Sequence, residues 1–230
     1  MRLAVVVPVF NEATAVESTL ARLSPLRTRG ARVIVVDGGS TDATTTLAKP
    51  HADQVMESDR GRAQQMNVGA RAAIEGGAEV LLFVHADSEL PHSADRLIDT
   101  ALRTSGRVWG RFDVRIDGAP PMLTIVSAMM NWRSRLTGIC TGDQAIFVRR
   151  SAFEQLSGFA PIALMEDIEF SKRAKHLSRP VAISARVLTS GRRWQRHGIW
   201  RTIVLMWRFR IAYFFGADPQ GLAQQYRDAR

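Results

Sequence analysis

The stretch Glu79-Val80-Leu81-Leu82-Phe83-Val84-His85-Ala86-Asp87-Ser88 indicates the fold of this chain more clearly than any other. Its five consecutive apolar residues, 80–84, are too few for a typical helix and predict a strand that is buried on both faces. The strand then ends in a histidine, a carboxylate and a hydroxyl. Small molecules bound by α/β sheets lie beyond the carboxyl ends of the parallel strands. Asp87 would therefore point a carboxylate oxygen into that site, where it could coordinate Mg²⁺ or Mn²⁺.

Strand and helix patterns alternate on both sides of this stretch. The alternation predicts an α/β fold, with a mostly parallel Rossmann-type sheet flanked by helices. Ser24-Pro25 is expected to end the first helix. Expected strands cover residues 3–7, 31–36, 54–57 and 80–84, and expected helices cover about 14–23, 61–74 and 93–102.

The second half of the chain is less regular and predicts a smaller antiparallel portion. Residues 108–116 alternate between apolar and polar and are expected to form an edge or antiparallel strand. The sequence contains no linker, so we expect one domain, with a first half (about 1–105), a second half (about 106–198) and a C-terminal helical segment (199–230). Further helices are expected at 120–136, 150–156 and 166–176, and further strands at 145–148 and 181–184.

Composition limits the partners and the compartment. The 230 residues carry a net charge of +9, which favours an anionic partner such as nucleic acid, a membrane surface or a phosphorylated substrate. The single cysteine, Cys140, excludes an internal disulfide and fits a reducing compartment. The apolar start, residues 1–8, lacks a signal-peptide pattern, and no run of 18 apolar residues occurs. We therefore expect a cytoplasmic location, with peripheral contact at the inner membrane face left open.

Two common nucleotide-binding motifs are absent. The turn after the first strand holds Pro8 and Phe10, where the dinucleotide fingerprint requires glycines, and no P-loop sequence occurs. The second strand ends at Asp37, whose carboxylate could accept hydrogen bonds from a base or a ribose. A loop-capping role for Asp37 is equally open.

Five motifs, taken in order, resemble those of family 2 glycosyltransferases. The donor-site motifs are Val-Pro-Val-Phe-Asn-Glu at 7–12, Val-Asp-Gly-Gly-Ser-Thr-Asp at 36–42 and His-Ala-Asp-Ser at 85–88. Met-Glu-Asp at 165–167 and Arg-Arg-Trp at 192–194 are similar to the acceptor and diphosphate motifs. The chain looks most like a small bacterial subgroup labelled arsenosugar-biosynthesis glycosyltransferases. The resemblance implies the GT-A fold, with a nucleotide-sugar half at about 1–105 and an acceptor half at about 106–198. It also implies a metal-dependent, inverting, hexosyltransferase-like enzyme that uses a UDP- or GDP-sugar.

The resemblance also implies a set of site residues. The sequence departs from the family at His85, where many relatives have aspartate, so His85 could contact ribose or metal, or only pack. Asp167 would be the catalytic base, and Glu166 would bind acceptor or donor sugar; a favourable interaction with the helix dipole is the alternative for both. The residues expected to contact the donor are Pro8, Glu12, Asp37, Arg62, His85, Arg192 and Arg193. The metal would be held by Asp87 and His197, and the acceptor would be contacted by Asp143, Gln144 and Trp194.

Alternatives remain for the C-terminal segment and for the function. Residues 199–215 are apolar but interrupted by arginines, which fits an anionic membrane surface, packing on the sheet, or a contact in a homo-oligomer. The chain as a whole could instead be a basic module that binds membrane or nucleic acid without catalysis. A sugar nucleotidyltransferase is disfavoured, because the glycine-rich, lysine-bearing phosphate loop is missing.

Overall fold

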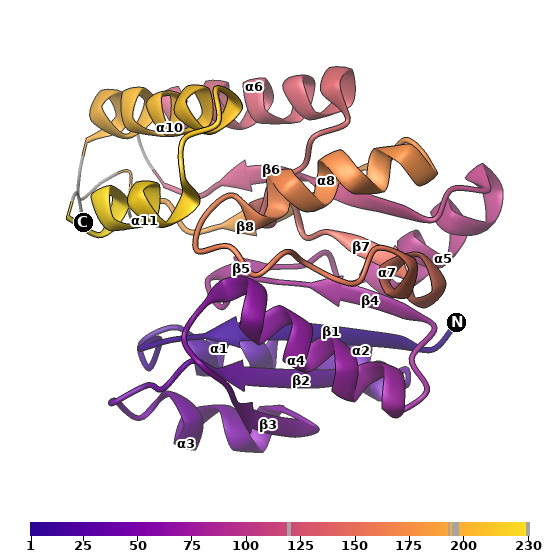
Figure 1. The fold of residues 1–230 in the computed structure, drawn as a ribbon. Helices are drawn as coiled ribbons and strands as arrows, with labels where there is room; N and C mark the ends of the chain where they lie inside the picture. Colours follow the sequence, from indigo (N-terminus) through magenta and orange to yellow (C-terminus); the bar gives the residue numbers. More distant parts are fainter. Residues whose placement is uncertain (119–120, 193, 195–197, 229–230) are drawn as a thin grey trace.

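One mixed sheet runs through the structure, a computed structural model that describes residues 1–118, 121–192, 194 and 198–228 (Figure 1). Its strands are β1 Leu3–Val9, β2 Arg32–Asp37, β3 Gln54–Glu57, β4 Val80–Phe83, β5 Ser88–Glu89, β6 Trp109–Ile116, β7 Phe147–Arg149 and β8 Val181–Thr189. Their order across the sheet is β3-β2-β1-β4-β7-β6-β8-β5. The α/β fold predicted from the sequence is confirmed.

The first four strands, β1 to β4, form the parallel half of the sheet. In its register Val6 lies opposite Ile34 on one side and Phe83 on the other, and all three side chains are buried. Short runs of β-branched and other apolar residues fit this setting, because both faces of a parallel sheet are covered. All four strands therefore point their carboxyl ends toward the same edge.

The other half of the sheet differs from the expectation in two places. The strand expected at an edge or in antiparallel pairing, β6, lies inside the sheet, where it pairs antiparallel with β7, as expected, and parallel with β8. β8 is longer than expected and continues to Thr189, where it pairs antiparallel with β5, a strand that the sequence did not predict. With only two residues, β5 is too short to produce a periodic pattern.

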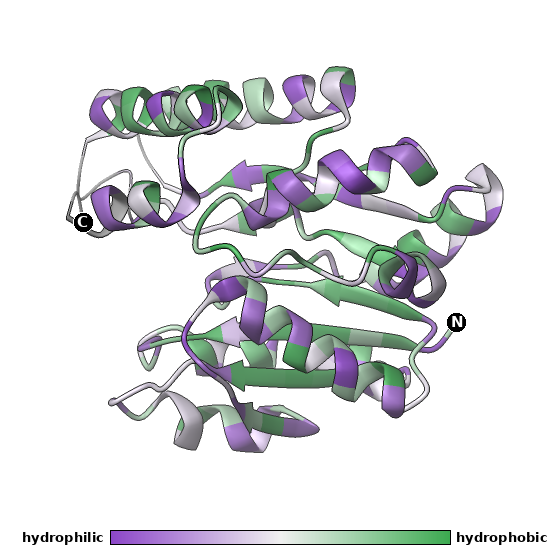
Figure 2. Ribbon diagram, in the orientation of Figure 1, coloured by the Kyte–Doolittle hydropathy of each residue, from purple (hydrophilic) through white to green (hydrophobic). Residues whose placement is uncertain are grey.

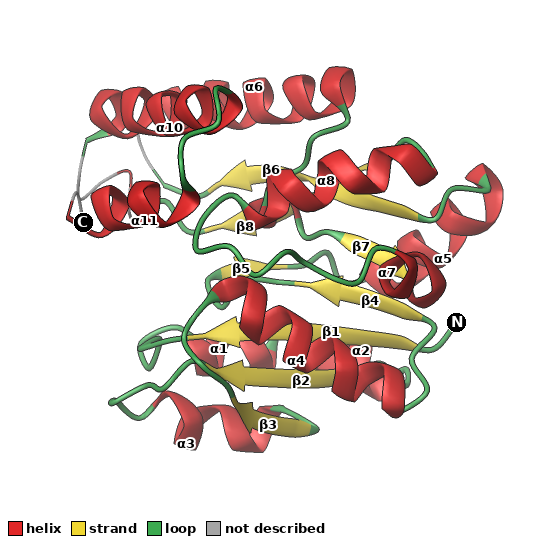
Figure 3. Cartoon of the chain, viewed as in Figure 1, coloured by secondary structure: helices red, strands yellow, loops and turns green. Residues whose placement is uncertain are grey.

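Helices cover both faces of the sheet (Figure 3). The first helix, α1, ends at Ala21, before Ser24-Pro25 as expected. A second helix that the sequence did not predict, α2, begins at Ser24, because proline is tolerated in a first helical turn. The helices are α1 Val16–Ala21, α2 Ser24–Thr28, α3 Thr44–Ala48, α4 Arg62–Glu75, α5 Ala94–Ser105, α6 Met122–Thr137, α7 Arg150–Gln155, α8 Glu166–Leu177, α10 Ile199–Phe214 and α11 Pro219–Asp228, with 3₁₀ turns at Lys49–His51 and Gly142–Gln144.

The close packing of α4 on the sheet fixes where that helix begins. Gly69 lies so near β1 that an added Cβ would be 2.5 Å from a methyl group of Val6 and 2.9 Å from one of Val36. Gln65, one turn earlier, donates its amide N–H groups to the carbonyls of Val9 (2.7 Å) and Val36 (2.8 Å). These contacts place Arg62, the first residue of α4, at the carboxyl ends of β1 and β2.

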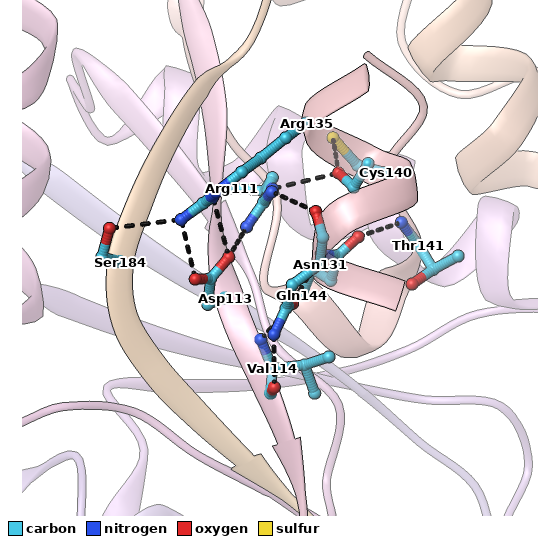
Figure 4. Close-up of polar contacts among 10 residues, drawn as sticks. Arg111, Asp113, Val114, Asn131, Arg135, Cys140, Thr141, Gln144 and Ser184 are labelled. Carbon is cyan, nitrogen blue, oxygen red and sulfur yellow. Dashed lines mark hydrogen bonds and ion pairs between the residues drawn. The ribbon is translucent and has the colours of Figure 1, made fainter. Parts of the chain in front are cut away.

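A buried polar network connects β6, α6 and the 142–144 turn (Figure 4). Arg111 is fully buried and pairs with Asp113, which also receives the guanidinium of Arg135 at 2.8 Å. Asn131 exchanges two hydrogen bonds with the backbone of Val114 and accepts the amide N–H of Gln144 at 3.3 Å. Arg111 and Asp113, whose alternating charges suggest an exposed face in the sequence, are therefore covered by α6 and paired, while Arg115 further along β6 is exposed.

Candidate active site

Two loops beyond the carboxyl ends of β1 and β2 are joined by hydrogen bonds. Asn11 donates its backbone N–H to the hydroxyl of Ser40 (2.8 Å) and accepts the N–H of Thr41 on its side-chain oxygen (2.9 Å). The N–H of Glu12 donates to the hydroxyl of Thr44 at 2.8 Å. The two loops that carry the first two sequence motifs thus form one continuous wall.

Asp37 stabilises this wall from within. Its side chain is buried, and its carboxylate accepts the N–H groups of Gly39 (3.0 Å) and Ser40 (2.7 Å) as well as the hydroxyl of Ser40. Of the two roles left open by the sequence, loop capping accounts for these contacts. Pro8, also expected to contact the donor, is half-buried near the end of β1, opposite Val36.

The starts of α4 and α8 meet through an ion pair. Nη1 of Arg62 lies 3.2 Å from Oε1 of Glu166, whose side chain is only 3% exposed. Burial raises the pKa of Glu166, the charge of Arg62 opposes this rise, and the neighbouring charge of Asp167 adds to it. Arg62 is therefore the group that most favours the ionised form of this buried carboxylate.

Asp167 and His85 lie on either side of a glycine. The carboxylate of Asp167 accepts the N–H of Gly142 (2.8 Å) and that of Ile168 (2.7 Å). A Cβ on Gly142 would lie 2.4 Å from Nε2 of His85, whose Nδ1 is 3.2 Å from a carboxylate oxygen of Asp143. A small pocket at this point is lined by His85, Gly142, Glu166 and Asp167. The end of β4, the 142–144 turn and the start of α8 therefore converge.

Gly142→Ala tests this convergence. The glycine does not have a positive φ, so the added methyl group acts through its contact with the His85 ring. We expect turnover to fall roughly tenfold to a hundredfold, because a misplacement of about 1 Å in a reacting site can cost that much. Initial rates and thermal melting would be measured together. The control is Gly221→Ala in α11, where the nearest atom would be 3.8 Å from the Cβ; equal rates in both variants would contradict the expectation.

Asp87 and Arg192 extend the site along the same edge. The carboxylate of Asp87 is half-buried and accepts no hydrogen bond from any described residue, while its backbone carbonyl accepts the N–H of Ser190 at 3.2 Å. The guanidinium of Arg192 lies 3.5 Å from the carboxylate of Glu12 and 3.4 Å from the hydroxyl of Thr14. The segment after β8 therefore bridges the ends of β1 and β4.

A metal ion at this edge would have to share its ligands with a substrate. The described part of the chain contains no group of three His, Cys, Asp or Glu side chains placed to hold a metal. Mg²⁺ is commonly bound by one or two carboxylates, with substrate phosphates and water completing its shell. The free carboxylate of Asp87 fits that arrangement. Two expected contacts, Arg193 and His197, lie outside the described residues.

The three expected acceptor contacts lie in different settings. Gln144 is fully buried; its amide donates to Asn131 and accepts the N–H of Thr141 (3.2 Å), so its contacts are those of a residue that holds the turn. The side chain of Asp143 is 44% exposed beside His85. Trp194 is half-buried.

Arg133 is a site candidate that the sequence did not indicate. Two of its guanidinium nitrogens, Nε and Nη2, are buried and have no hydrogen-bond partner among the described residues. Burial, and after it the charge of Arg210, lower the pKa of Arg133 to about 10, while the charge of Asp167 opposes this change. Arg133 therefore places a buried positive charge near Asp167. No motif marks this arginine, which lies in an otherwise apolar helical pattern.

Comparison with known proteins identifies relatives of this chain. Residues 4–156, well over half of the chain, match the family described as Glycosyl transferase family 2. The succinoglycan biosynthesis protein ExoA of Rhizobium meliloti (strain 1021) is 34% identical over 107 residues, which are 44% of this chain and 32% of that protein. The chain thus matches about a third of the length of this curated relative.

Solved structures share the fold at low identity. TarS 1–349 of S. aureus in complex with UDP-GlcNAc has a TM-score of 0.67 and 18% identity, over 83% of this chain and 58% of that one. The mannosyltransferase PcManGT of Pyrobaculum calidifontis, in complex with GDP-Man and Mn²⁺, has a TM-score of 0.67 and 22% identity, over 97% and 68%. Glucosyl-3-phosphoglycerate synthase of Mycobacterium tuberculosis, in complex with Mn²⁺ and UDP-Glc, has a TM-score of 0.59 and 18% identity, over 82% and 70%.

Proposed function

This chain belongs to glycosyl transferase family 2, and from that premise we propose that it transfers a sugar from a nucleotide-diphosphate donor to an acceptor hydroxyl or phosphate, with inversion at the anomeric carbon. The observation that carries the proposal is the meeting of Asp167, Gly142 and His85 at the carboxyl edge of the sheet. This edge is where α/β sheets bind ligands. Solved relatives that bind UDP-GlcNAc or GDP-Man support the choice of donor.

The donor would lie along the wall formed by the loops after β1 and β2. Pro8 and Glu12 would line the nucleotide pocket, and Asp37 would hold the loop that completes it. Arg62 would face the nucleotide from the start of α4, while Arg192 and Arg193 would stabilise the departing diphosphate. Arginine suits this role because its planar guanidinium stays charged and matches phosphate oxygens.

Asp167 would act as the general base. An acceptor hydroxyl oxygen forms a bond to the anomeric carbon, the bond from that carbon to the donor phosphate oxygen breaks, and the hydroxyl proton passes to Asp167. The N–H groups of Gly142 and Ile168 hold the carboxylate for this transfer. A divalent ion such as Mg²⁺ or Mn²⁺, held by Asp87 and by His197, would offset the charge of the leaving diphosphate.

Calorimetry with UDP and with GDP, with and without Mn²⁺, tests the donor proposal. We expect saturable binding that requires the metal. Asp87→Asn should weaken it by roughly 10- to 100-fold, because losing a charged contact costs ~1.5–3 kcal/mol. Glu75→Gln, at the far, exposed end of α4, should bind like the wild type. Salt-sensitive binding of polyanions without any dependence on nucleotide or metal would instead favour a non-catalytic basic module.

The identity of the sugar and of the acceptor is a narrower proposal. The resemblance to the subgroup labelled arsenosugar-biosynthesis glycosyltransferases supports a hexose donor and a single domain over 1–230. Incubation with a panel of UDP- and GDP-sugars and cell extract, followed by mass spectrometry of the products, would identify both substrates. Transfer of a sugar other than a hexose would remove the hexosyltransferase assignment and leave the family unchanged.

A further inference from the structure

Two helices carry nearly all of the large apolar side chains that the described residues expose. On α6 and α10 these residues recur at intervals of three or four, so each set forms one stripe along its helix. Each side chain is between 50% and 80% exposed. The stripes consist of Ile125, Met129, Trp132 and Leu136 on α6, and of Trp200, Val204, Trp207, Ile211 and Phe214 on α10, followed by Phe215.

The opposite sides of both helices face the protein. α6 buries Leu123 and Ser127, and the hydroxyl of Ser127 accepts the N–H of Ile116 on β6 (2.9 Å). α10 buries Phe209 in a cluster with Met165 and Ile168, the residues on either side of Glu166 and Asp167. The exposed stripes are therefore the outer faces of two docked helices, and one of these helices packs beside the proposed catalytic residues.

The two stripes belong to one face of the molecule. Ile139, two residues after the end of α6, packs against the same hydrophobic cluster as Leu205 and Met206 of α10, and the charge of Arg210 on α10 lowers the pKa of Arg133 on α6. Figure 1 draws both helices along the same outer side, beyond β6 and α8, and Figure 2 shows hydrophobic residues along each of them. We call this surface the α6–α10 face. Apolar patches on this scale mark interaction sites.

The two helices of this face carry charge of one sign, because α6 and α10 together contain five arginines and no Asp or Glu. Segments 118–142 and 170–217 contain thirteen Arg and Lys residues and no Asp or Glu. The rest of the chain holds the other eighteen basic residues and all 22 acidic ones, so the net charge of +9 comes from these two segments. Arg201 and Arg208 of α10 are exposed. The α6–α10 face therefore complements a negatively charged partner that is also apolar.

We propose that the α6–α10 face docks on the surface of an anionic lipid bilayer, with the two helices lying in the plane of the interface. An apolar stripe with tryptophans and arginines is the composition of helices that bind in this way. No helix in the described part of the chain is long and apolar enough to cross a membrane, so the contact is with one leaflet. The arginines would meet the phosphates of the headgroups.

A second copy of the chain fits this face less well. In a two-fold dimer the same patch meets itself, so arginines of one α10 would face arginines of the other. Neither α6 nor α10 contains a carboxylate to neutralise them. Like charges opposed across an interface cost binding energy, whereas an anionic bilayer supplies the missing counter-charge. Nucleic acid supplies the charge but no apolar phase for the two stripes.

Vesicle co-sedimentation tests the proposal with the full chain. Wild type is expected to bind vesicles of phosphatidylcholine with 30% phosphatidylglycerol and to bind pure phosphatidylcholine far less. Arg201→Glu/Arg208→Glu should lower the partition coefficient roughly thirtyfold or more, and Trp132→Ser/Trp207→Ser at least about tenfold. The control is Arg71→Glu/Arg96→Glu, which makes the same charge change on the exposed faces of α4 and α5 and should bind like the wild type.

Three outcomes would overturn the proposal. The first is that the wild type does not bind anionic vesicles, and the second is that vesicle binding falls equally in the control and in the α10 variant. The third is that the wild type binds no vesicles and forms a dimer, which Trp132→Ser/Trp207→Ser dissociates. Thermal melting verifies that each variant is folded, and the two face variants alter different side chains, so misfolding of one leaves the other decisive. Because the readout is lipid binding, the result is independent of whether sugar transfer is confirmed.

Discussion

Asp167→Asn is expected to slow sugar transfer at least roughly a hundredfold, the usual contribution of a general base, while nucleotide diphosphate still binds with Mn²⁺. Asparagine keeps the size of the side chain and cannot take the acceptor proton. One of the two hydrogen bonds from Gly142 and Ile168 can still be accepted by the amide oxygen, so the start of α8 should stay in place. The measurement is the initial rate of nucleoside diphosphate release with the active donor and acceptor.

The comparison needed for Asp167→Asn is between rate and binding. A fall in turnover with unchanged nucleotide affinity assigns Asp167 to the chemical step. Glu75→Gln, remote from the site on α4, should keep the wild-type rate. Near-normal turnover of Asp167→Asn would remove Asp167 from the role of base, and a parallel loss of nucleotide binding would place its contribution in donor binding.

Asp113→Asn is expected to destabilise the fold by ~3 kcal/mol, which is at the low end for a broken buried ion pair. Arg111 is fully buried and relies on Asp113, so removing the carboxylate leaves an uncompensated charge beneath α6. For a chain of this size the loss corresponds to a drop of roughly 6–12 °C in the melting temperature.

The matched control for that variant is Asp117→Asn, four residues further along the chain, where the carboxylate is exposed. Its effect should stay within about 0.5 kcal/mol, as is usual for surface substitutions. Calorimetric or circular-dichroism melting of both variants decides the matter. Equal melting temperatures would mean that the buried charges of β6 are satisfied without Asp113.

The parallel half of the fold could be predicted from the sequence because its signals are local. Short apolar runs such as 80–84 are too short for helices and fit only a strand covered on both faces. For β6 the antiparallel pairing was predicted, but its burial was not, because its alternating charges suggest a face in water. Their burial depends on α6 covering Arg111 and Asp113 from elsewhere in the chain, and no pattern within 109–116 reports that contact.

The candidate site was predictable in its parts and not in its assembly. The order of the motifs indicated His85, Glu166 and Asp167, and the structure brings these three together around Gly142. A tight turn at Gly142 beside the site could be predicted, but the need for a glycine there could not, because it follows from how closely the His85 ring approaches. Arg133 was missed for the same reason: its burial beside α10 is a property of the tertiary packing.

The most direct test of the central claim is a crystal structure with UDP or GDP and Mn²⁺, with the metal located by its anomalous signal. The account predicts one Mn²⁺ peak at the carboxylate of Asp87, the nucleotide along the loops after β1 and β2, and Asp167 facing the open side of the diphosphate. A nucleotide bound away from this edge, or a metal that does not touch Asp87, would contradict it.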